Sequence, residues 1–144
     1  MPIGAPDYWG ISVRPSFGSA RRATFARAAN TSAITIALTI TGNGIIYGGY
    51  VLSSGVATQK ADSYEIFIDG EAVAFATFLN QNTWLLNKEH VAGLYELRHD
   101  DVNFKYCLGI MPGITFEKSI RIQYLETYGR TPNIIGDIIY TLIE

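Results

Sequence analysis

The sequence predicts an all-β protein folded as an antiparallel β-sandwich, and three observations lead to this fold class. Apolar residues alternate with polar ones along most of the chain, a period of two that is typical of strands with one buried face. Turn residues interrupt these runs about every 8–12 residues, as in sandwiches and barrels. No Pro/Ser-rich linker interrupts residues 31–144. We therefore expect one domain of about seven to nine short strands.

Residues 1–30 are expected to form an extended N-terminal arm that precedes this domain. The segment is rich in proline and glycine and carries arginines with a single acidic residue, a composition that does not close a core of its own. Aromatic and arginine side chains are frequent anchors of protein interfaces. The predicted partner-binding residues are Tyr8, Trp9, Arg14, Arg21, Arg22 and Arg27. Within the arm, a short helix capped by Ser19 and an extended strand along a neighbour both remain open for residues 19–30.

The first predicted hairpin occupies residues 31–52. Its first strand runs from Thr31 to Thr41, and the alternation places Ile34, Ile36, Leu38 and Ile40 on the buried face. Gly42-Asn43-Gly44 supplies residues that tolerate positive φ, so the chain is expected to turn there. Ile45–Leu52 is the predicted returning strand, and Gly48-Gly49 indicates a β-bulge within it.

A second hairpin is predicted at residues 63–78. Tyr64, Ile66 and Ile68 share one face of its first strand, and Glu65, Phe67 and Asp69 share the other. Asp69-Gly70 is a strong signal for a two-residue type I′ turn, since both central residues of that turn need positive φ.

The second half of the chain predicts further strands. The alternation covers Val102–Gly109, stops at the turn signal Pro112-Gly113 and resumes over Ile120–Tyr124. Ile134–Ile143 is apolar enough for a strand buried on both faces. For Asn82–Ala92 a helix of two or three turns and a non-helical segment both remain open.

The charge of the chain is unevenly distributed. Thirteen acidic and eleven basic residues give a net charge of −2, but residues 1–60 carry +4 and residues 61–144 carry −6. The nearly neutral total argues against a nucleic-acid-binding protein, which would need a basic footprint. The asymmetry indicates either a basic arm that meets an acidic partner or an unevenly decorated solvated surface.

The chain is expected neither to cross a membrane nor to be secreted. Residues 28–59 contain no charge, but their interior glycines and threonines suit a soluble hairpin better than a bilayer helix. The first seven residues lack the basic and apolar regions of a signal peptide. The single cysteine, Cys107, lies in an alternating apolar run and is expected to be structural.

No motif indicates a reaction, and neither a cofactor nor a metal is predicted. The only histidines are His90 and His99, and no G-x-S-x-G elbow accompanies them, so a hydrolase triad is not expected. Paired metal ligands such as C-x-x-C are absent, and the spacing of Asp62, Asp100 and Asp101 does not favour a calcium site.

Two hypotheses that involve sugars remain open. Glu71, Glu117 and Glu126 lie near predicted strand ends, where paired carboxylates could hydrolyse a glycoside, although a turn at Glu71 and an exposed edge at Glu117 explain these residues better. Trp84 could stack on a sugar ring, or fill the core.

Three segments resemble small β-sandwich structural proteins of tailed bacteriophages: Ile40–Gly49 (ITGNGIIYGG), Tyr64–Glu71 (YEIFIDGE) and Tyr106–Ser119 (YCLGIMPGITFEKS). The resemblance spans residues 31–125. It implies a jelly roll that decorates a capsid as a homotrimer or forms part of a tail, with an arm that lies on adjacent subunits. The implied location is the virion, after synthesis in the host cytoplasm, and the implied partner is a capsid or other virion protein.

A second resemblance concerns the fold alone. Ile66–Glu71 and Gly113–Ile122 are similar to one half of the double jelly-roll fructofuranosidases. Chains of that family are more than twice as long, and the second jelly roll is missing here, so catalysis is not implied.

The sequence thus leads to the hypothesis of a non-enzymatic capsid decoration or cementing protein that binds neighbouring subunits through its arm. The alternative hypothesis is a carbohydrate- or receptor-binding sandwich module of a phage tail.

Overall fold

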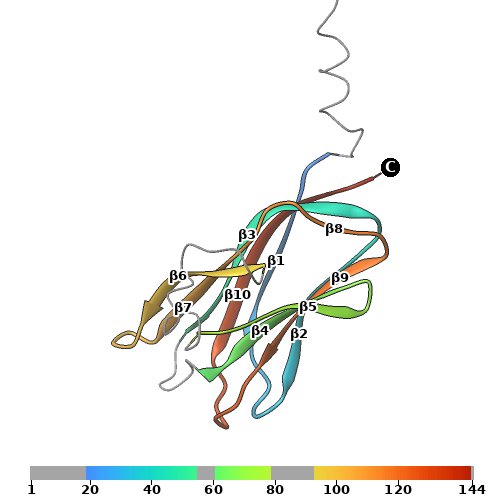
Figure 1. Ribbon diagram of the computed structural model, residues 1–144. Helices are drawn as coiled ribbons and strands as arrows, with labels where there is room; N and C mark the ends of the chain where they lie inside the picture. The colour runs from blue at the N-terminus through green and yellow to red at the C-terminus, as the bar shows by residue number, and fades with distance from the viewer. Residues whose placement is uncertain (1–18, 55–60, 79–92, 144) are drawn as a thin grey trace, which may run out of the picture.

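A computed structural model describes residues 19–54, 61–78 and 93–143, which form ten strands in two packed sheets (Figure 1). The first half of the chain contributes β1 (Arg21–Ala28), β2 (Ile34–Thr41), β3 (Gly44–Ser54), β4 (Ser63–Ile68) and β5 (Glu71–Thr77). The second half contributes β6 (Leu94–Asp100), β7 (Lys105–Ile110), β8 (Ile114–Phe116), β9 (Ser119–Leu125) and β10 (Asn133–Leu142). The predicted all-β antiparallel sandwich is confirmed.

The strands pair in the nested order of a jelly roll. β1 pairs with β10, β2 with β9, β3 with β7 and β8, and β4 with β5. The larger sheet has the order β1-β10-β3-β7-β6, with β8 also beside β3, and the smaller sheet has the order β2-β9-β4-β5. Nested antiparallel pairing rolls one long ribbon into two sheets that cover each other's apolar faces. No helix in the described parts of the chain is long and apolar enough to cross a membrane.

Aromatic side chains dominate one end of the core between the sheets. The rings of Tyr64 and Tyr124 pack edge to face with centroids 4.9 Å apart, and Phe78 stacks on Tyr106 at 5.4 Å. All four side chains are almost fully buried. The Tyr64 hydroxyl donates a 2.7 Å hydrogen bond to the Leu52 carbonyl oxygen, so the ring is buried without an unpaired polar group.

Residues 21–28 form a strand of the sandwich, which places the start of the domain earlier than residue 30. β1 pairs with β10 along its whole length, so the extended alternative for residues 19–30 is the correct one. Its inward side chain, Phe25, packs on Gly136, where a β-carbon would lie 2.1 Å from the ring. The segment therefore extends along a strand of its own chain and not along another molecule. Residues 1–18 of the expected arm lie outside the described residues.

The turn at Gly42-Asn43-Gly44 does not close a hairpin, contrary to expectation, because β2 and β3 belong to different sheets. The chain crosses over the end of the sandwich, and Gly44 is so close to the neighbouring strand β10 that a β-carbon would lie 2.1 Å from the Thr141 carbonyl oxygen. Turn residues indicate that the chain changes direction, but they do not indicate which strands will pair.

The buried face of β2 also differs from the prediction. The register with β9 shifts between Ile36 and Leu38, so one extra residue, Ala37, stands in a β-bulge. Before the bulge Thr35 and Ala37 are buried while Ile34 and Ile36 are exposed, and after it Ile40 is buried as expected. The bulge has turned the first two isoleucines from the core to solvent.

Other predicted elements are confirmed in place. Asp69 and Gly70 have φ values of 53° and 90°, as a type I′ turn between β4 and β5 requires. The register of β10 with β3 shifts beside Gly48, which confirms the bulge predicted there. The strand predicted at residues 120–124 is β9, and its residues Ile120, Ile122 and Tyr124 are buried.

Two C-terminal predictions need correction. Residues 101–104 form the turn between β6 and β7, so the strand predicted from Val102 begins at Lys105. β10 has one buried face instead of two, since Ile138 is 1% exposed but Ile139 is 39% exposed. The Asn82–Ala92 segment lies outside the described residues.

Candidate interaction surfaces

The outer face of the smaller sheet exposes large apolar side chains. What we call the apolar face comprises Ile34, Ile36, Phe75 and Leu125, whose exposed fractions are 52, 51, 51 and 37%. Ile36 and Phe75 stand at the two ends of one cross-strand row, with Gln123 and Glu65 between them. Ile34 and Leu125 are direct partners in the next row. Exposed apolar groups gathered on one face of a sheet are typical of interaction surfaces.

One arginine is held against this sheet by an aromatic ring. The Arg121 guanidinium lies 4.3 Å from the centroid of the Phe67 ring, its direct cross-strand partner. The Arg121 Nε is buried without a hydrogen-bond partner in the described part of the chain. The ring orients the guanidinium and leaves its positive charge in place.

The predicted partner-binding arginines fall into different environments. Arg22 on β1 forms a bidentate ion pair with Asp137 on β10, at 2.8 and 2.5 Å, so this basic residue meets an acidic one of the same chain. Arg27 donates a 3.2 Å hydrogen bond to the Ile36 carbonyl oxygen and links the two sheets at their edge. Arg21 is exposed. Tyr8, Trp9 and Arg14 lie outside the described residues.

The aspartate side chains at two turns accept hydrogen bonds from backbone amides. Asp69 accepts hydrogen bonds from the amides of Lys118, Ser119 and Glu117, which lower its pKa. Asp100 accepts from the amides of Val102 and Asn103 and also pairs with Arg98, and its pKa is lowered by the Asn103 contacts above all. These carboxylates therefore hold turns in place.

Two buried acids serve the same purpose at one end of the sandwich. Asp62 accepts from the Tyr124 hydroxyl at 2.5 Å and from the amide and hydroxyl of Thr127, both at 2.9 Å. Burial raises the pKa of Asp62 although these donors oppose the shift. Burial also acts to raise the pKa of Glu126, but amides including those of Ser32, Tyr128 and Gly129 outweigh it and lower this pKa.

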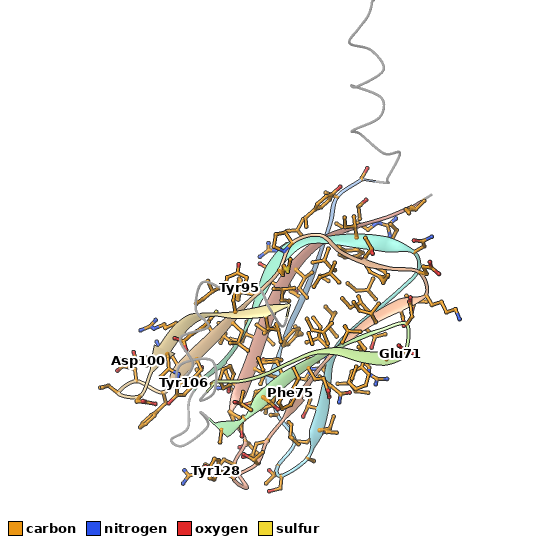
Figure 2. The ribbon with its side chains drawn as sticks, viewed as in Figure 1. Glu71, Phe75, Tyr95, Asp100, Tyr106 and Tyr128 are labelled. Carbon is orange, nitrogen blue, oxygen red and sulfur yellow. The ribbon has the colours of Figure 1, made fainter. Side chains whose placement is uncertain are left out.

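The three candidate glycosidase glutamates do not gather in one place: Glu71 and Glu117 share one end of the molecule and Glu126 is distant from them. Glu71 follows the β4–β5 turn. In Figure 2 it lies at the end of the molecule opposite to the labelled Asp100 of the β6–β7 hairpin. Glu117 shares the end of Glu71, because its amide bonds to Asp69 in that turn. Glu126 lies beyond the far end of the seven-residue strand β9, about 20 Å away at the usual rise per residue. The described residues contain no cluster of three metal-ligating side chains.

Of the remaining candidates, Cys107 is partly exposed on the outer face of the larger sheet. It lines a hollow of about 290 Å³ together with Leu52, Ser54, Arg98, Lys105 and Tyr106. Burial raises the pKa of its thiol to about 11, which makes it unreactive at neutral pH and agrees with the structural role expected. Trp84 and His90 lie outside the described residues.

Sequence reasoning missed the apolar face. Its two isoleucines are assigned to the core by the simple alternation, and only the bulge at Ala37 reverses them. A signal was nevertheless present, because Phe67 shares one face of its strand with the charged residues Glu65 and Asp69. A large ring on a polar face was the available indication of a binding surface.

Comparisons with known proteins show a likeness of fold. No family model matches the sequence, and no curated protein matches it. A chain of the acidic stable capsid of Helicobacter pylori bacteriophage KHP30 matches with a TM-score of 0.54 at 6% identity, over 89% of this chain and 91% of its own. A chain of the cyanophage Pam1 capsid asymmetric unit matches with a TM-score of 0.50 at 13% identity, over 99% of this chain and 94% of its own. Each likeness extends over nearly the whole of both chains.

Proposed function

We propose that this chain is a non-enzymatic structural protein of a phage virion that decorates or cements the capsid. The observation that carries the proposal is the extent of the fold likeness: two chains from phage capsids match over 89% or more of both partners. The likeness covers nearly all of each matched capsid chain, so it concerns the complete sandwich and not one part of it. A small single domain of this kind is suited to binding a shell that other subunits have closed.

The apolar face provides the surface for that role. Ile36 and Phe75 are each half exposed on the outer face of the smaller sheet, and Arg121 lies on β9, a strand between theirs, with no ion pair in the described part of the chain. Aliphatic and aromatic groups around an arginine form the usual centre of a protein interface. The occupant we propose is a neighbouring shell subunit that contributes apolar side chains and a carboxylate for Arg121.

The N-terminal residues are proposed as a second contact with the shell. Tyr8, Trp9 and Arg14 precede β1, and the part of the original arm from Arg21 onward is committed to the sandwich. A truncation that tests the arm must therefore stop at residue 18. Removal of β1 would unmask the edge of β10 and confuse a loss of binding with a loss of folding.

The test measures binding of the purified protein to expanded capsids of the encoding phage that were assembled without it. We expect the full chain to bind, and the Ile36→Lys/Phe75→Lys variant to bind at least about tenfold more weakly, since charges would be buried unpaired. Ile139→Lys is the matched control, because Ile139 is a partly exposed isoleucine on the outer face of the other sheet. Circular dichroism establishes that each variant is folded.

The outcomes separate the parts of the proposal. If the full chain does not bind the capsid, the decoration role is wrong. If the double lysine variant binds as tightly as the full chain, the apolar face is not the contact. If deletion of residues 1–18 leaves binding unchanged, the arm is not needed. Binding to a glycan array by the full chain, in the absence of capsid binding, would instead favour the alternative receptor-binding role.

A further inference from the structure

A hollow on the outer face of the larger sheet combines two apolar side chains with two cations. Leu52 of β3, Cys107 of β7 and Arg98 of β6 stand in one cross-strand row. Ser54 and Lys105 are direct partners in the next row, and all five residues line the hollow. Its volume of about 290 Å³ lies near the lower limit of ligand pockets, so it suits one side chain of a partner better than a larger ligand.

The hollow carries a net positive charge. Arg98 is paired with Asp100 through one terminal nitrogen at 3.0 Å, and its side chain is 55% exposed. Lys105 is exposed and forms no ion pair in the described part of the chain, so two cations stand against one carboxylate. Glu96 and Asp101, the other acids of the hairpin, lie beside the imidazole that is buried on the inner side of β6. A carboxylate placed between Arg98 and Lys105 would therefore accept charge-assisted hydrogen bonds from both.

Exposed aliphatic side chains accompany these cations on the same hairpin. Leu97 is the extra residue of a β-bulge beside Arg98 and is 54% exposed. Val102, at the tip of the hairpin, is 82% exposed, and its turn is fixed because Asp100 accepts the amides of Val102 and Asn103, both at 2.9 Å. A fixed turn loses little conformational entropy when it binds. The partner that fits this surface therefore carries an aliphatic side chain next to its carboxylate.

The opposite end of the same chain carries such a pair of side chains. Glu71, the first residue of β5, is exposed and forms no ion pair within the described residues. Val73 is the extra residue of the bulge in β5 and is 52% exposed. The hairpin that presents both is fixed as well, since Asp69 in its turn accepts the Lys118 amide at 2.6 Å. Figure 2 shows Glu71 and the hairpin of Asp100 at opposite ends of the molecule.

We propose that copies of this chain associate end to end, with the Glu71 carboxylate of one copy between Arg98 and Lys105 of the next. Val73 of the first copy then lies against Leu97 of the second. Since Glu71 and the hollow belong to different sheets and to opposite ends, the contact is heterologous and repeats from copy to copy. The apolar face takes no part in this contact, so the inference does not depend on the proposed binding to a capsid.

The test measures self-association of the purified full chain by analytical ultracentrifugation in the absence of capsids. The unmodified chain is expected to form oligomers. Glu71→Lys and Lys105→Glu should each weaken this association at least about tenfold, since like charges would then face each other. The variant with both substitutions has the two charges exchanged and should associate to within about threefold of the unmodified chain. Both side chains are exposed, so neither change disturbs the core.

Two controls locate the contact between copies. Glu117→Lys makes the same charge change at the end that Glu71 occupies and should leave self-association unchanged, as should Ile36→Lys on the apolar face. A monomeric unmodified chain, or a double variant that associates no better than the single variants, would overturn the proposal. An equal loss for Glu117→Lys would also overturn it, because general attraction between charged ends would then explain the association. Loss of self-association in Ile36→Lys alone would place the contact on the apolar face instead.

Discussion

The two outer faces of the sandwich differ in how their exposed side chains are satisfied. On the larger sheet, Arg22 and Asp137 neutralise each other, and Tyr95 lies across Gly109, where a β-carbon would be 2.4 Å from its ring. On the smaller sheet, half-exposed Ile36 and Phe75 have no such cover within the described residues. The larger sheet also exposes apolar side chains, among them Leu97 and Ile139, but its Arg22 is paired with Asp137 of the same sheet, whereas Arg121 on the smaller sheet forms no ion pair within the described residues. This difference is the reason for assigning the interface to the apolar face.

The largest expected effect contrasts the two sides of the smaller sheet. Ile66→Ala removes a fully buried side chain of β4, and we expect it to lower the free energy of unfolding by about 2 to 5 kcal/mol, because a cavity remains. Ile36→Ala, on the outer side of the same sheet, should change it by no more than about 0.5 kcal/mol. Urea denaturation measures both. A comparable loss for Ile36→Ala would mean that the apolar face contributes to folding and is not reserved for binding.

The next effect concerns the attachment of β1 to the larger sheet. Gly136→Val is expected to destabilise the protein by about 3 kcal/mol, since a side chain there would displace the Phe25 ring. Thr24→Val is the control, because Thr24 is an exposed neighbour of Phe25 on the same strand. Thermal unfolding distinguishes them. If Gly136→Val has no effect, β1 is not an integral strand and the arm would extend to residue 30 after all.

Local turn chemistry predicted part of this fold, and the reason is physical. A type I′ turn needs two residues with positive φ, and Asp69-Gly70 meets that need within two positions. The turn at Gly42–Gly44 was equally visible, but its outcome depended on β9 and β10, which lie far along the chain. Strand partnership in a jelly roll is decided by such distant segments, so a local pattern cannot report it.

The candidate surface was predictable to a smaller degree. A period of two is unchanged when a strand slips by one residue, so Ile34 and Ile36 could not be assigned to a face without knowledge of the bulge at Ala37. The ion pair of Arg22 with Asp137 joins residues 115 positions apart. The charge asymmetry of the sequence therefore indicated an acidic partner for the arginines, and for Arg22 that partner is the chain's own β10.

A smaller effect is expected at the loop that follows β9. Glu126→Gln replaces one of the two oxygens that accept amides of Ser32, Tyr128 and Gly129 and should cost about 1 to 3 kcal/mol at neutral pH. The pKa of Glu126 is lowered by folding, so its contribution is present above about pH 4.3, the unfolded value, and is lost as the pH falls through the folded value. Glu117→Gln, an exposed control, should show neither effect. Parallel loss of stability in acid for both variants would exclude Glu126 as the cause.

The smallest effect tests the ion pair on the larger sheet. Arg22→Ala should lower the urea midpoint slightly at low ionic strength and by less at about 1 M salt, where the Debye length falls to about 3 Å and the ion pair is weakened. Arg21→Ala is the matched control, since Arg21 is its exposed neighbour and forms no ion pair in the described part of the chain. Capsid binding by the same two variants then sharpens the comparison. If Arg22→Ala weakens capsid binding far more than it weakens folding, Arg22 contacts the capsid in spite of its ion pair with Asp137. The larger sheet then shares the interface that we assign to the smaller one.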